Sequence, residues 1–348
     1  MANVYRGYGI FSHDLTSGKA ICSLRDTQLF TTEKRPIVWV YAGIGSQWIE
    51  MGSDLMKIPI FAQTIKKCHD VLAPKGIDVL KIVTAADPET FSKVLNSYIG
   101  IAAVELALTD VLKAIGLQPD YIIGHSVGEV GVGYADGCFT IEEAMMASYS
   151  RGLASAESKT ILGAMAAIGI NHKEVAKILP DDIDIACHNS IDSTTISGPA
   201  ESVRAFVKEL TAKNIFAREV ACSGIPLHSR YIKEMGSRLL SRLDEVIKTP
   251  KMRSSKWLSS SFPKDQWATE EAQYSSGRYH TKNLLSPVLF EEVLDLLPKN
   301  ALTIEVAPHA LLKSILKRSL KDGIHLSLTQ RENKDGTLYL MDALGKYV

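Results

Sequence analysis

The sequence predicts an α/β fold in which a large subdomain is built on a parallel sheet and carries a smaller, ferredoxin-like α+β subdomain as an insert. Two runs of consecutive apolar residues, 37–41 and 121–124, have the pattern of strands buried on both faces, which is typical of parallel sheets. Between about 163 and 220 the predicted order is strand, helix, strand, strand, helix, strand, which is that of a ferredoxin-like unit. The 348 residues suffice for two such units at about 150 residues per domain.

The composition excludes several classes of protein. Apolar residues make up 46% of the chain and charged residues 22%, values typical of folded globular proteins and not of disordered or collagen-like chains. Lys and Arg number 39, as do Asp and Glu, so no net charge attracts the chain to nucleic acid or to an anionic membrane. The five cysteines are scattered without a CxxC pair, which argues against a disulfide framework or a zinc site and favours a reducing cytoplasm. We find neither a signal-peptide pattern nor an apolar run near ~18 residues, so we expect no membrane span.

The elements of the large subdomain follow in order along the first part of the chain. Residues 1–35 mix glycine, serine, threonine and charged residues with little periodicity, which indicates a linker or edge segment. The strand at 37–41 follows. An aspartate N-cap before a proline, and then an apolar stripe, predict a helix within 88–116. The buried strand at 121–124 leads directly into a helix that ends at Gly137.

The insert and the return to the large subdomain complete the predicted order. In the insert we predict strands at 164–168, 183–186, 194–197 and 216–220, with helices near 172–178 and 200–213. After it we predict strands at 257–260 and 303–306 and a helix from about 310 to 320. The predicted units are therefore the linker segment 1–35, the core 36–160 and 226–330, the ferredoxin-like subdomain 161–225 and the C-terminal segment 331–348.

A strand, a sharp turn and a helix meet at Gly124-His125-Ser126-Val127-Gly128, which fits the pattern G-x-S-x-G. On such a turn the serine hydroxyl projects at the carboxyl edge of the sheet, and the two glycines let neighbouring backbone pass closely. This context is that of α/β-hydrolase-like folds, so we assign the large subdomain to that class and Ser126 as the candidate nucleophile. The alternative interpretation is an ordinary glycine-rich turn.

A serine hydroxyl is a poor nucleophile without a base within hydrogen-bond reach, and histidine is the usual base. Of the nine histidines, His228 lies in a loop marked by glycine and proline at the predicted junction of the subdomains, where clefts form. We therefore select His228, although a lone loop histidine is more often a surface residue. His125 adjoins the serine, and we expect it to point elsewhere in a positioning or capping role.

Acyl chemistry needs two further kinds of group. The oxyanion of a tetrahedral intermediate needs two N–H donors, for which we select Val127, directly after the serine, and Ile44, in the glycine-rich loop after the first strand. Arg151 lies on the helix that opens near Thr140. Most helical arginines are solvated, but a guanidinium fork pairs with a carboxylate through two parallel hydrogen bonds, which gives Arg151 a role if the substrate is an acid.

Together these segments resemble the malonyl/acetyl transferase domain of animal-type fatty acid synthases and, more broadly, the acyltransferases of fatty acid and polyketide synthesis. The resemblance covers about residues 35–330 and rests on several separate motifs. They are Gly43-Ile44-Gly45-Ser46-Gln47-Trp48, Gly124-His125-Ser126-Val127-Gly128-Glu129, Gly133-Tyr134-Ala135-Asp136-Gly137-Cys138, Gly163-Ala164-Met165-Ala166-Ala167, Cys187-His188-Asn189-Ser190, Ile196-Ser197-Gly198-Pro199, Asn283-Leu284-Leu285-Ser286-Pro287-Val288-Leu289-Phe290 and Ala307-Pro308-His309-Ala310-Leu311-Leu312. The opening Tyr5-Arg6-Gly7-Tyr8 is similar to the linker before this domain in animal synthases, which implies adjacent synthase domains such as a ketosynthase.

The resemblance implies a role for each candidate residue. Ser126 is acylated, and His228 is its base in a serine–histidine dyad, oriented by the backbone carbonyl of Asn283 and not by an aspartate. Arg151 pairs with the free carboxylate of a malonyl group. Ile44 and Val127 form the oxyanion hole, and the acyl pocket includes Gln47, His125, Met165, Asn189 and Leu227. No metal or bound cofactor is implied: a coenzyme A thioester is the donor, and the phosphopantetheine arm of an acyl carrier protein is the acceptor.

One departure from the family pattern affects the predicted acyl group. Malonyl-selecting members usually have phenylalanine just before the active-site histidine, whereas this chain has Leu227. The smaller side chain opens space beside the acyl α-carbon, so loading of methylmalonyl, as in polyketide synthases of the same architecture, stands beside loading of malonyl. A single methylene in a pocket is worth only ~1–3 kcal/mol.

Two other functions compete with acyl transfer at this stage. A serine esterase or thioesterase would keep the serine turn but require an acidic third member, which is not evident, and it would give Arg151 no purpose with neutral esters. A domain that only holds neighbouring modules together would not need Ser126, His228 and Arg151 in their motif settings. The sequence therefore favours a cytoplasmic acyltransferase.

Overall fold

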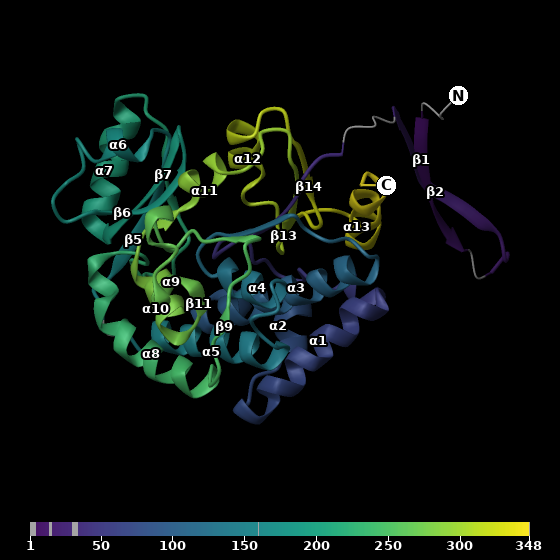
Figure 1. The fold of residues 1–348 in the computed structure, drawn as a ribbon, viewed down its shortest axis with the longest axis horizontal. Helices are drawn as coiled ribbons and strands as arrows, with labels where there is room; N and C mark the ends of the chain where they lie inside the picture. The colour runs from purple at the N-terminus through teal and green to yellow at the C-terminus, as the bar shows by residue number, and fades with distance from the viewer. Residues whose placement is uncertain (1–4, 14–15, 30–33, 159, 348) are drawn as a thin grey trace.

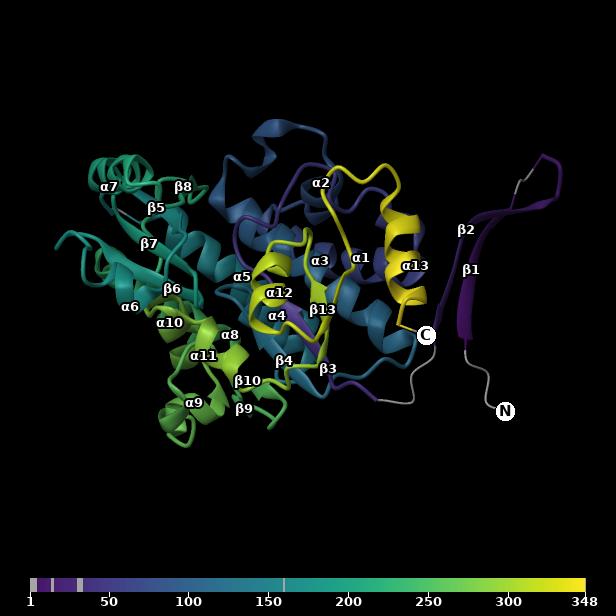
Figure 2. The same ribbon diagram turned by 90° about the horizontal axis from the view of Figure 1, so that it is seen from above.

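The computed structural model describes residues 5–13, 16–29, 34–158 and 160–347. Two five-stranded sheets lie side by side in it, each covered by helices of its own, and a hairpin of the first residues projects from the opposite side of the molecule (Figures 1 and 2). The larger sheet carries the main hydrophobic core, and the smaller sheet has a separate one. This is the arrangement of a large subdomain with a small inserted subdomain that the sequence predicts.

The larger sheet is parallel throughout. In spatial order its strands are β10 (Trp257–Leu258), β4 (Tyr121–Gly124), β3 (Ile37–Tyr41), β13 (Leu302–Val306) and β14 (Ile324–Ser327). All five residues of β3 are buried, as its continuous apolar run predicts. From β3 the chain adds β4 and then β10 on one side of the sheet, and from β13 it adds β14 on the other side, so the strand order reverses between β3 and β13. Ligands of such sheets bind outside the carboxyl ends of the strands at this reversal.

Helices pack around this sheet and against one another. They are α1 (Pro59–Leu72), α2 (Val79–Thr84), α3 (Val94–Ala114), α4 (Gly128–Ala135), α5 (Ile141–Ala156), α8 (Lys233–Val246) and α10 (Gly277–Leu285), with α12 (Lys313–Ser319) and α13 (Gly336–Gly345) beside β14. By length and composition α3 alone among the described helices passes as a membrane span, but 83% of its most apolar window is buried inside the fold, against α1 and α5. The helix predicted from residue 88 begins only at Val94, because Asp87 caps a separate 3-10 turn at 88–91.

The smaller sheet has the strand order of a ferredoxin-like unit plus one added strand. In spatial order its strands are β12 (Val288–Leu289), β6 (Asp184–Ser190), β7 (Ser193–Pro199), β5 (Gly163–Ile168) and β8 (Ala217–Val220). On one face, α6 (His172–Val175) and α7 (Ala200–Ala212) enclose a core that includes Ala164, Ala166 and Phe206. Met165, between the two alanines, points from the other face into a cavity, as the two-residue period of a strand requires. The added strand β12 comes from outside the predicted insert 161–225.

The predicted linker or edge segment at the N-terminus contains two strands that its sequence pattern does not reveal. β1 (Tyr5–His13) and β2 (Ala20–Leu29) form an antiparallel hairpin that contacts the remainder of the fold through α13, where Tyr8 donates a hydrogen bond to Asp342. Nearly every residue of β2 is exposed, so the hairpin has no buried face and no apolar alternation to reveal it. Residues 1–4, 14–15 and 30–33 of the predicted linker, and residue 348 of the predicted C-terminal segment, lie outside the described residues.

The remaining elements connect the two subdomains. They are the short pair β9 (Lys251–Met252) and β11 (Tyr274–Ser275), with α9 (Glu270–Gln273) and α11 (Phe290–Asp295). The strand predicted at 257–260 is confined to two residues, and the helix predicted at 310–320 starts three residues later. The subdomain boundaries themselves stay a prediction.

Candidate active site

Ser126 lies on the sharp turn between β4 and α4, with a backbone φ of 56°. This left-handed conformation is strained for any residue with a side chain and is a recurrent feature of functional sites. The flanking glycines make the turn possible: a Cβ at Gly124 would lie 2.7 Å from the backbone N of Glu129, and one at Gly128 only 2.4 Å from the carbonyl oxygen of Tyr41. The turn therefore has the tight geometry that the G-x-S-x-G pattern predicts.

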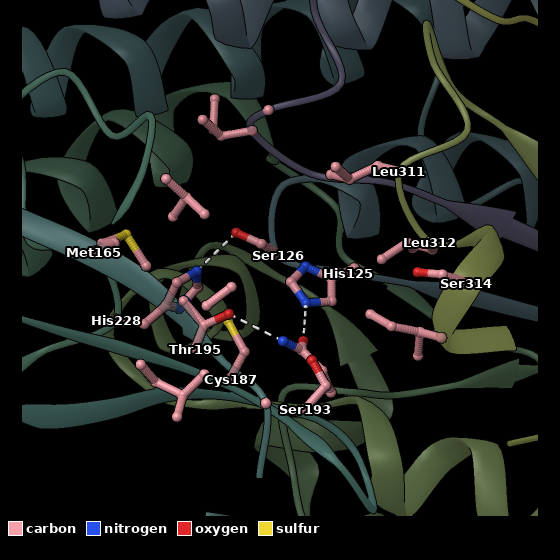
Figure 3. Close-up of a pocket in the computed structure, with 18 of the residues that line it drawn as sticks. His125, Ser126, Met165, Cys187, Ser193, Thr195, His228, Leu311, Leu312 and Ser314 are labelled. Atoms are coloured by element: carbon pink, nitrogen blue, oxygen red, sulfur yellow. Dashed lines mark hydrogen bonds between the residues drawn. The ribbon is translucent and has the colours of Figure 1, made fainter. Parts of the chain in front are cut away.

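Ser126 and His228 meet although 102 residues separate them. The Oγ of Ser126 lies 2.7 Å from Nε2 of His228, and both side chains are buried, with 6% and 3% exposure (Figure 3). His228 also has a positive φ, 56°, in the loop that returns from the smaller sheet. The candidate nucleophile and the candidate base thus each lie on a backbone position with positive φ.

His228 is oriented by the carbonyl of Ser286, beside the carbonyl of Asn283 that the resemblance implied. Nδ1 of His228 lies 2.8 Å from the carbonyl oxygen of Ser286, whereas the sequence resemblance implied the carbonyl of Asn283. Ser286 is the C-cap of α10, where backbone carbonyls lack helical partners and the helix dipole is negative. The Asn283 carbonyl also acts on the imidazole as a hydrogen-bond acceptor, and both carbonyls raise the pKa of His228. A proton on Nδ1 leaves Nε2 as the acceptor for the serine hydroxyl.

The electrostatic setting keeps His228 neutral. Burial, followed by the positive charge of Arg151, lowers the pKa of His228 to about 3, against the opposing effect of the two carbonyls. A neutral imidazole is the form that accepts the serine proton.

Arg151 lies on α5, whose first turn is fixed by a capping box between Thr140 and Glu143. Its Nη2 is 3.4 Å from the Oγ of Ser126, its Nη1 donates to Oδ1 of Asn283, and its guanidinium lies over the ring of Tyr98. The side chain is 2% exposed, and Nε is buried without a hydrogen-bond acceptor among the described residues. Burial lowers the pKa of Arg151, while Tyr98 and Glu129 oppose that effect.

The two predicted oxyanion donors flank the nucleophile. A Cβ at Gly43 would lie 3.1 Å from Cβ of Ser126, so the loop that carries Ile44 lies directly against the serine turn. Val127 is the N-cap of α4, where backbone N–H groups are free of helical partners. Within the described part of the chain, neither N–H donates to another protein group. Both remain available to an oxygen bound near Ser126.

A cavity of about 560 Å³ opens at this point, at the carboxyl ends of β3 and β4. Figure 3 shows Met165 and His228 on one side of Ser126 and Leu311 and Leu312 on the other. Of the predicted pocket residues, His125, Met165, Asn189 and Leu227 line the cavity. Gln47 does not, because its Oε1 turns back to accept a hydrogen bond of 2.8 Å from the backbone N of Gly45.

His125 lines the cavity beside Ser126 and is held by a chain of hydrogen bonds. Its Nε2 lies 2.9 Å from Oδ1 of Asn189, and Nδ2 of Asn189 donates to Oγ1 of Thr195 over 3.0 Å (Figure 3). Because the amide donates to Thr195, the histidine carries its proton on Nε2. This polar row is set into an otherwise largely apolar wall, which suits recognition of a short polar acyl group.

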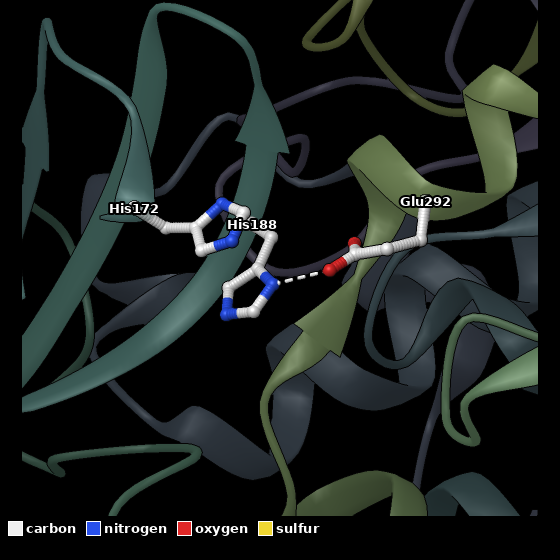
Figure 4. Close-up of side chains that lie close together, drawn as sticks. All are labelled: His172, His188 and Glu292. Atoms are coloured by element: carbon white, nitrogen blue, oxygen red, sulfur yellow. Dashed lines mark hydrogen bonds and ion pairs between the residues drawn. The ribbon is translucent and has the colours of Figure 1, made fainter. Parts of the chain in front are cut away.

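A second histidine cluster lies between the smaller sheet and α11 (Figure 4). The rings of His172 and His188 stack at 3.7 Å and are parallel within 2°. Nδ1 of His172 lies 3.1 Å from Oε2 of Glu291, and Nδ1 of His188 lies 2.6 Å from Oε1 of Glu292. A metal ion bound by an imidazole nitrogen lies in the plane of that ring. Two parallel, stacked rings have no common in-plane position, so they cannot both bind the same ion. We therefore assign the cluster as a hydrogen-bonded contact between the subdomains.

Comparison with known proteins identifies the family. The family profile described as "Acyl transferase domain" matches residues 38–345. The chain belongs to this acyltransferase family. It is 28% identical over 332 residues to a highly reducing polyketide synthase of Aspergillus sclerotiorum and 30% identical over 348 residues to one of Purpureocillium lilacinum. These alignments cover 90% and 91% of this chain but only 13% of each relative, so the chain spans about an eighth of their length.

Solved structures of acyltransferases share the fold. The loading acyltransferase of the avermectin polyketide synthase superposes with a TM-score of 0.79 at 23% identity, covering 89% of this chain and 99% of that one. The malonyl CoA-acyl carrier protein transacylase of Coxiella burnetii gives a TM-score of 0.75 at 22% identity, with 89% and 97% coverage. The predicted fold class, an α/β-hydrolase-like subdomain with a ferredoxin-like insert, is thereby confirmed, and the chain is an acyltransferase of the polyketide and fatty acid synthase type.

Proposed function

We propose that this acyltransferase moves malonyl, or a malonyl group substituted at its α-carbon, from coenzyme A to the phosphopantetheine thiol of an acyl carrier protein, through an ester on Ser126. The observation that carries the proposal is Arg151, a buried guanidinium that faces Ser126 and has no carboxylate partner among the residues described. Burying an acidic group without a partner costs several kcal/mol, and so does burying a base alone. When an acyl group that ends in a carboxylate binds beside Arg151, each charge becomes the partner of the other, and both costs are offset.

The first half-reaction follows from the dyad. His228 Nε2 takes the proton of Ser126 as Oγ attacks the thioester carbonyl, whose oxygen becomes negative between the N–H groups of Ile44 and Val127. When the tetrahedral intermediate collapses, the C–S bond breaks and the imidazolium returns its proton to the leaving thiolate. Coenzyme A departs, and the acyl group stays on Ser126.

The second half-reaction uses the same groups in reverse. The thiol of the carrier protein gives its proton to Nε2 of His228 and attacks the ester carbonyl of Ser126. The same two N–H groups stabilise the oxyanion, and the serine oxygen leaves with the proton from His228. One base and one oxyanion site serve both steps, which gives ping-pong kinetics. Burial of the dyad beside apolar walls disfavours attack by water during the interval.

The side chain at position 227 bears on the α-substituent. Leu227 is buried, lines the cavity and directly precedes His228. A branched aliphatic side chain there leaves more room beside the acyl α-carbon than a phenyl ring would. This supports methylmalonyl as an extender unit beside malonyl.

The setting of the reaction is part of the proposal. The relatives are synthases about eight times as long as the matched segment, so we infer that a carrier protein and a ketosynthase lie in the same polypeptide or assembly. The five cysteines are all free, which supports a reducing, cytoplasmic setting.

The test is intact-mass measurement of the protein after brief incubation with malonyl-CoA, methylmalonyl-CoA and acetyl-CoA in competition. We expect a malonyl or methylmalonyl adduct in preference to an acetyl adduct, and its loss on addition of the carrier protein in its pantetheine form. Ser126→Ala should carry no adduct, while Ser237→Ala, an exposed serine on α8, should match the wild type. An adduct on Ser126→Ala refutes the nucleophile, and release of free acid as fast as the carrier is acylated would indicate a hydrolase.

A further inference from the structure

Arg151 is connected to a buried carboxylate through two intervening side chains. Its Nη1 donates to Oδ1 of Asn283. Nδ2 of Asn283 donates to Oγ of Ser261 over 2.9 Å, and that hydroxyl donates to Oε2 of Glu129 over 2.8 Å. All four side chains are buried, so water does not interrupt the path.

Glu129 is the fixed end of this path. It lies in the first turn of α4, three residues after Ser126. Besides the hydroxyl of Ser261, its carboxylate accepts hydrogen bonds from the N and Oγ of Ser260, at 2.7 and 3.0 Å, and from the hydroxyl of Tyr279, at 2.5 Å. The hydroxyl of Ser260 also lies 2.7 Å from the carbonyl oxygen of Gly124 and has one proton to donate, which leaves the N of Ser260 and the hydroxyls of Ser261 and Tyr279 as donors directed at the carboxylate alone. These contacts fix the carboxylate of Glu129 at a position where it does not touch Arg151.

The direction of the hydrogen bonds fixes the amide of Asn283. The hydroxyl of Ser261 has one proton, which it donates to Glu129. Its oxygen therefore accepts the hydrogen bond from Nδ2 of Asn283. Oδ1 is then left to face the guanidinium. In the flipped orientation an NH2 group would oppose Arg151, donor against donor. The serine and the glutamate thus determine which end of the amide meets the arginine.

A neutral contact at this position has a consequence for the charge of the site. An amide orients the guanidinium but does not neutralise its positive charge. A carboxylate in direct contact would neutralise that charge and compete with an incoming acid. Burial lowers the pKa of Arg151, and Tyr98 and then Glu129 oppose that effect, Glu129 without a direct ion pair.

We propose that Asn283, through its side chain, and Glu129 are positioning residues that hold the guanidinium of Arg151 oriented toward Ser126, and that they thereby set the preference for carboxylated over plain acyl groups. This inference rests on the carboxylate-binding role of Arg151 in the proposed function. It gives Asn283 a role in substrate selection, distinct from the backbone role that the family resemblance implied.

The decisive variant is Asn283→Asp, which preserves size and places a carboxylate against Arg151. We expect the ratio of kcat/KM for malonyl-CoA to that for acetyl-CoA to fall ~10- to 100-fold, the loss falling on malonyl transfer. A role in folding alone would lower both transfers by one factor and leave the ratio at the wild-type value, and that result would overturn the inference.

A second pair of variants keeps the question open to test if Asn283→Asp does not fold. Ser261→Ala removes the hydroxyl that fixes the amide, and Ser261→Thr retains it. We expect a lower malonyl-to-acetyl ratio in the alanine variant and a ratio restored toward the wild type in the threonine variant; equal ratios in the two contradict the inference. Failure of the proposed function itself is distinguishable, since wild-type protein would then form no malonyl-serine at all.

Discussion

Replacement of Arg151 by alanine should separate malonyl transfer from acetyl transfer. The guanidinium is 2% exposed and has a neutral amide, a hydroxyl and an aromatic ring as its contacts, so a malonyl carboxylate would find no other cation or water to replace it. Truncating one partner of a buried charge pair costs about 2–5 kcal/mol, which corresponds to a factor of roughly 30 to 5,000 in kcat/KM. An acetyl group has no carboxylate to lose, and its transfer should fall far less.

The same substitution should also move the pH profile. The charge of Arg151 is the second cause, after burial, of the low pKa of His228, which is about 3. Removing a positive charge makes the imidazolium less unfavourable and raises that pKa. More of the base is then protonated at a given low pH, so the acid limb of kcat/KM should shift to higher pH.

Steady-state kinetics with both thioesters over a range of pH would test these expectations. Arg151→Lys is the matched control: it keeps the charge, so the acid limb should stay in place, but it lacks the bidentate fork, so malonyl transfer should fall to an intermediate value. Equal losses of malonyl and acetyl transfer in Arg151→Ala would refute the carboxylate-pairing role.

Two further predictions concern the acyl pocket and stability. Leu227→Phe fills space in the cavity beside the dyad and should lower the methylmalonyl-to-malonyl ratio, measured by competition between the two thioesters, by roughly 10- to 200-fold; an unchanged ratio would show that position 227 does not contact the α-substituent. Burial raises the pKa of Glu305, on β13, from 4.5 to about 7, so the folded state favours its protonated form, and the stability gained in that form is lost as pH rises from about 4.5 through 7. The free energy of unfolding of Glu305→Gln, relative to that of the wild type, should therefore be higher at pH 8 than at pH 5 by up to about 3 kcal/mol. A difference in unfolding free energy that does not vary with pH would contradict the assignment.

The parts of the fold that the sequence predicts well are those in which burial leaves a simple pattern. The runs at 37–41 and 121–124 are continuous because both faces of those strands are covered, and the glycines around Ser126 are required by backbone that passes within van der Waals contact. The strands at 5–13 and 20–29 leave no such pattern. Their side chains are mostly exposed on both faces, and what pairs them is the antiparallel backbone ladder between the two strands.

Within the site, side-chain chemistry was easier to predict than backbone chemistry. Ser126, His228 and Arg151 were selected for what their side chains do, and the structure brings all three together. The carbonyl of Ser286 belongs to a helix end whose position no residue type encodes, so the prediction names only Asn283, three residues earlier, and omits Ser286. The contact of Asn283 with Arg151 joins positions 132 residues apart and depends on packing that a single sequence does not reveal.

The two sheets divide the work of the enzyme between them. The larger, parallel sheet and its helices carry Ser126, Arg151 and the loop with Ile44, whereas Met165, Asn189 and Thr195 reach the cavity from the smaller sheet. Substitutions in that second wall therefore reshape the space around the acyl chain without displacing the nucleophile. The shape of the cavity can therefore change on one side while the serine turn on the other side stays as it is.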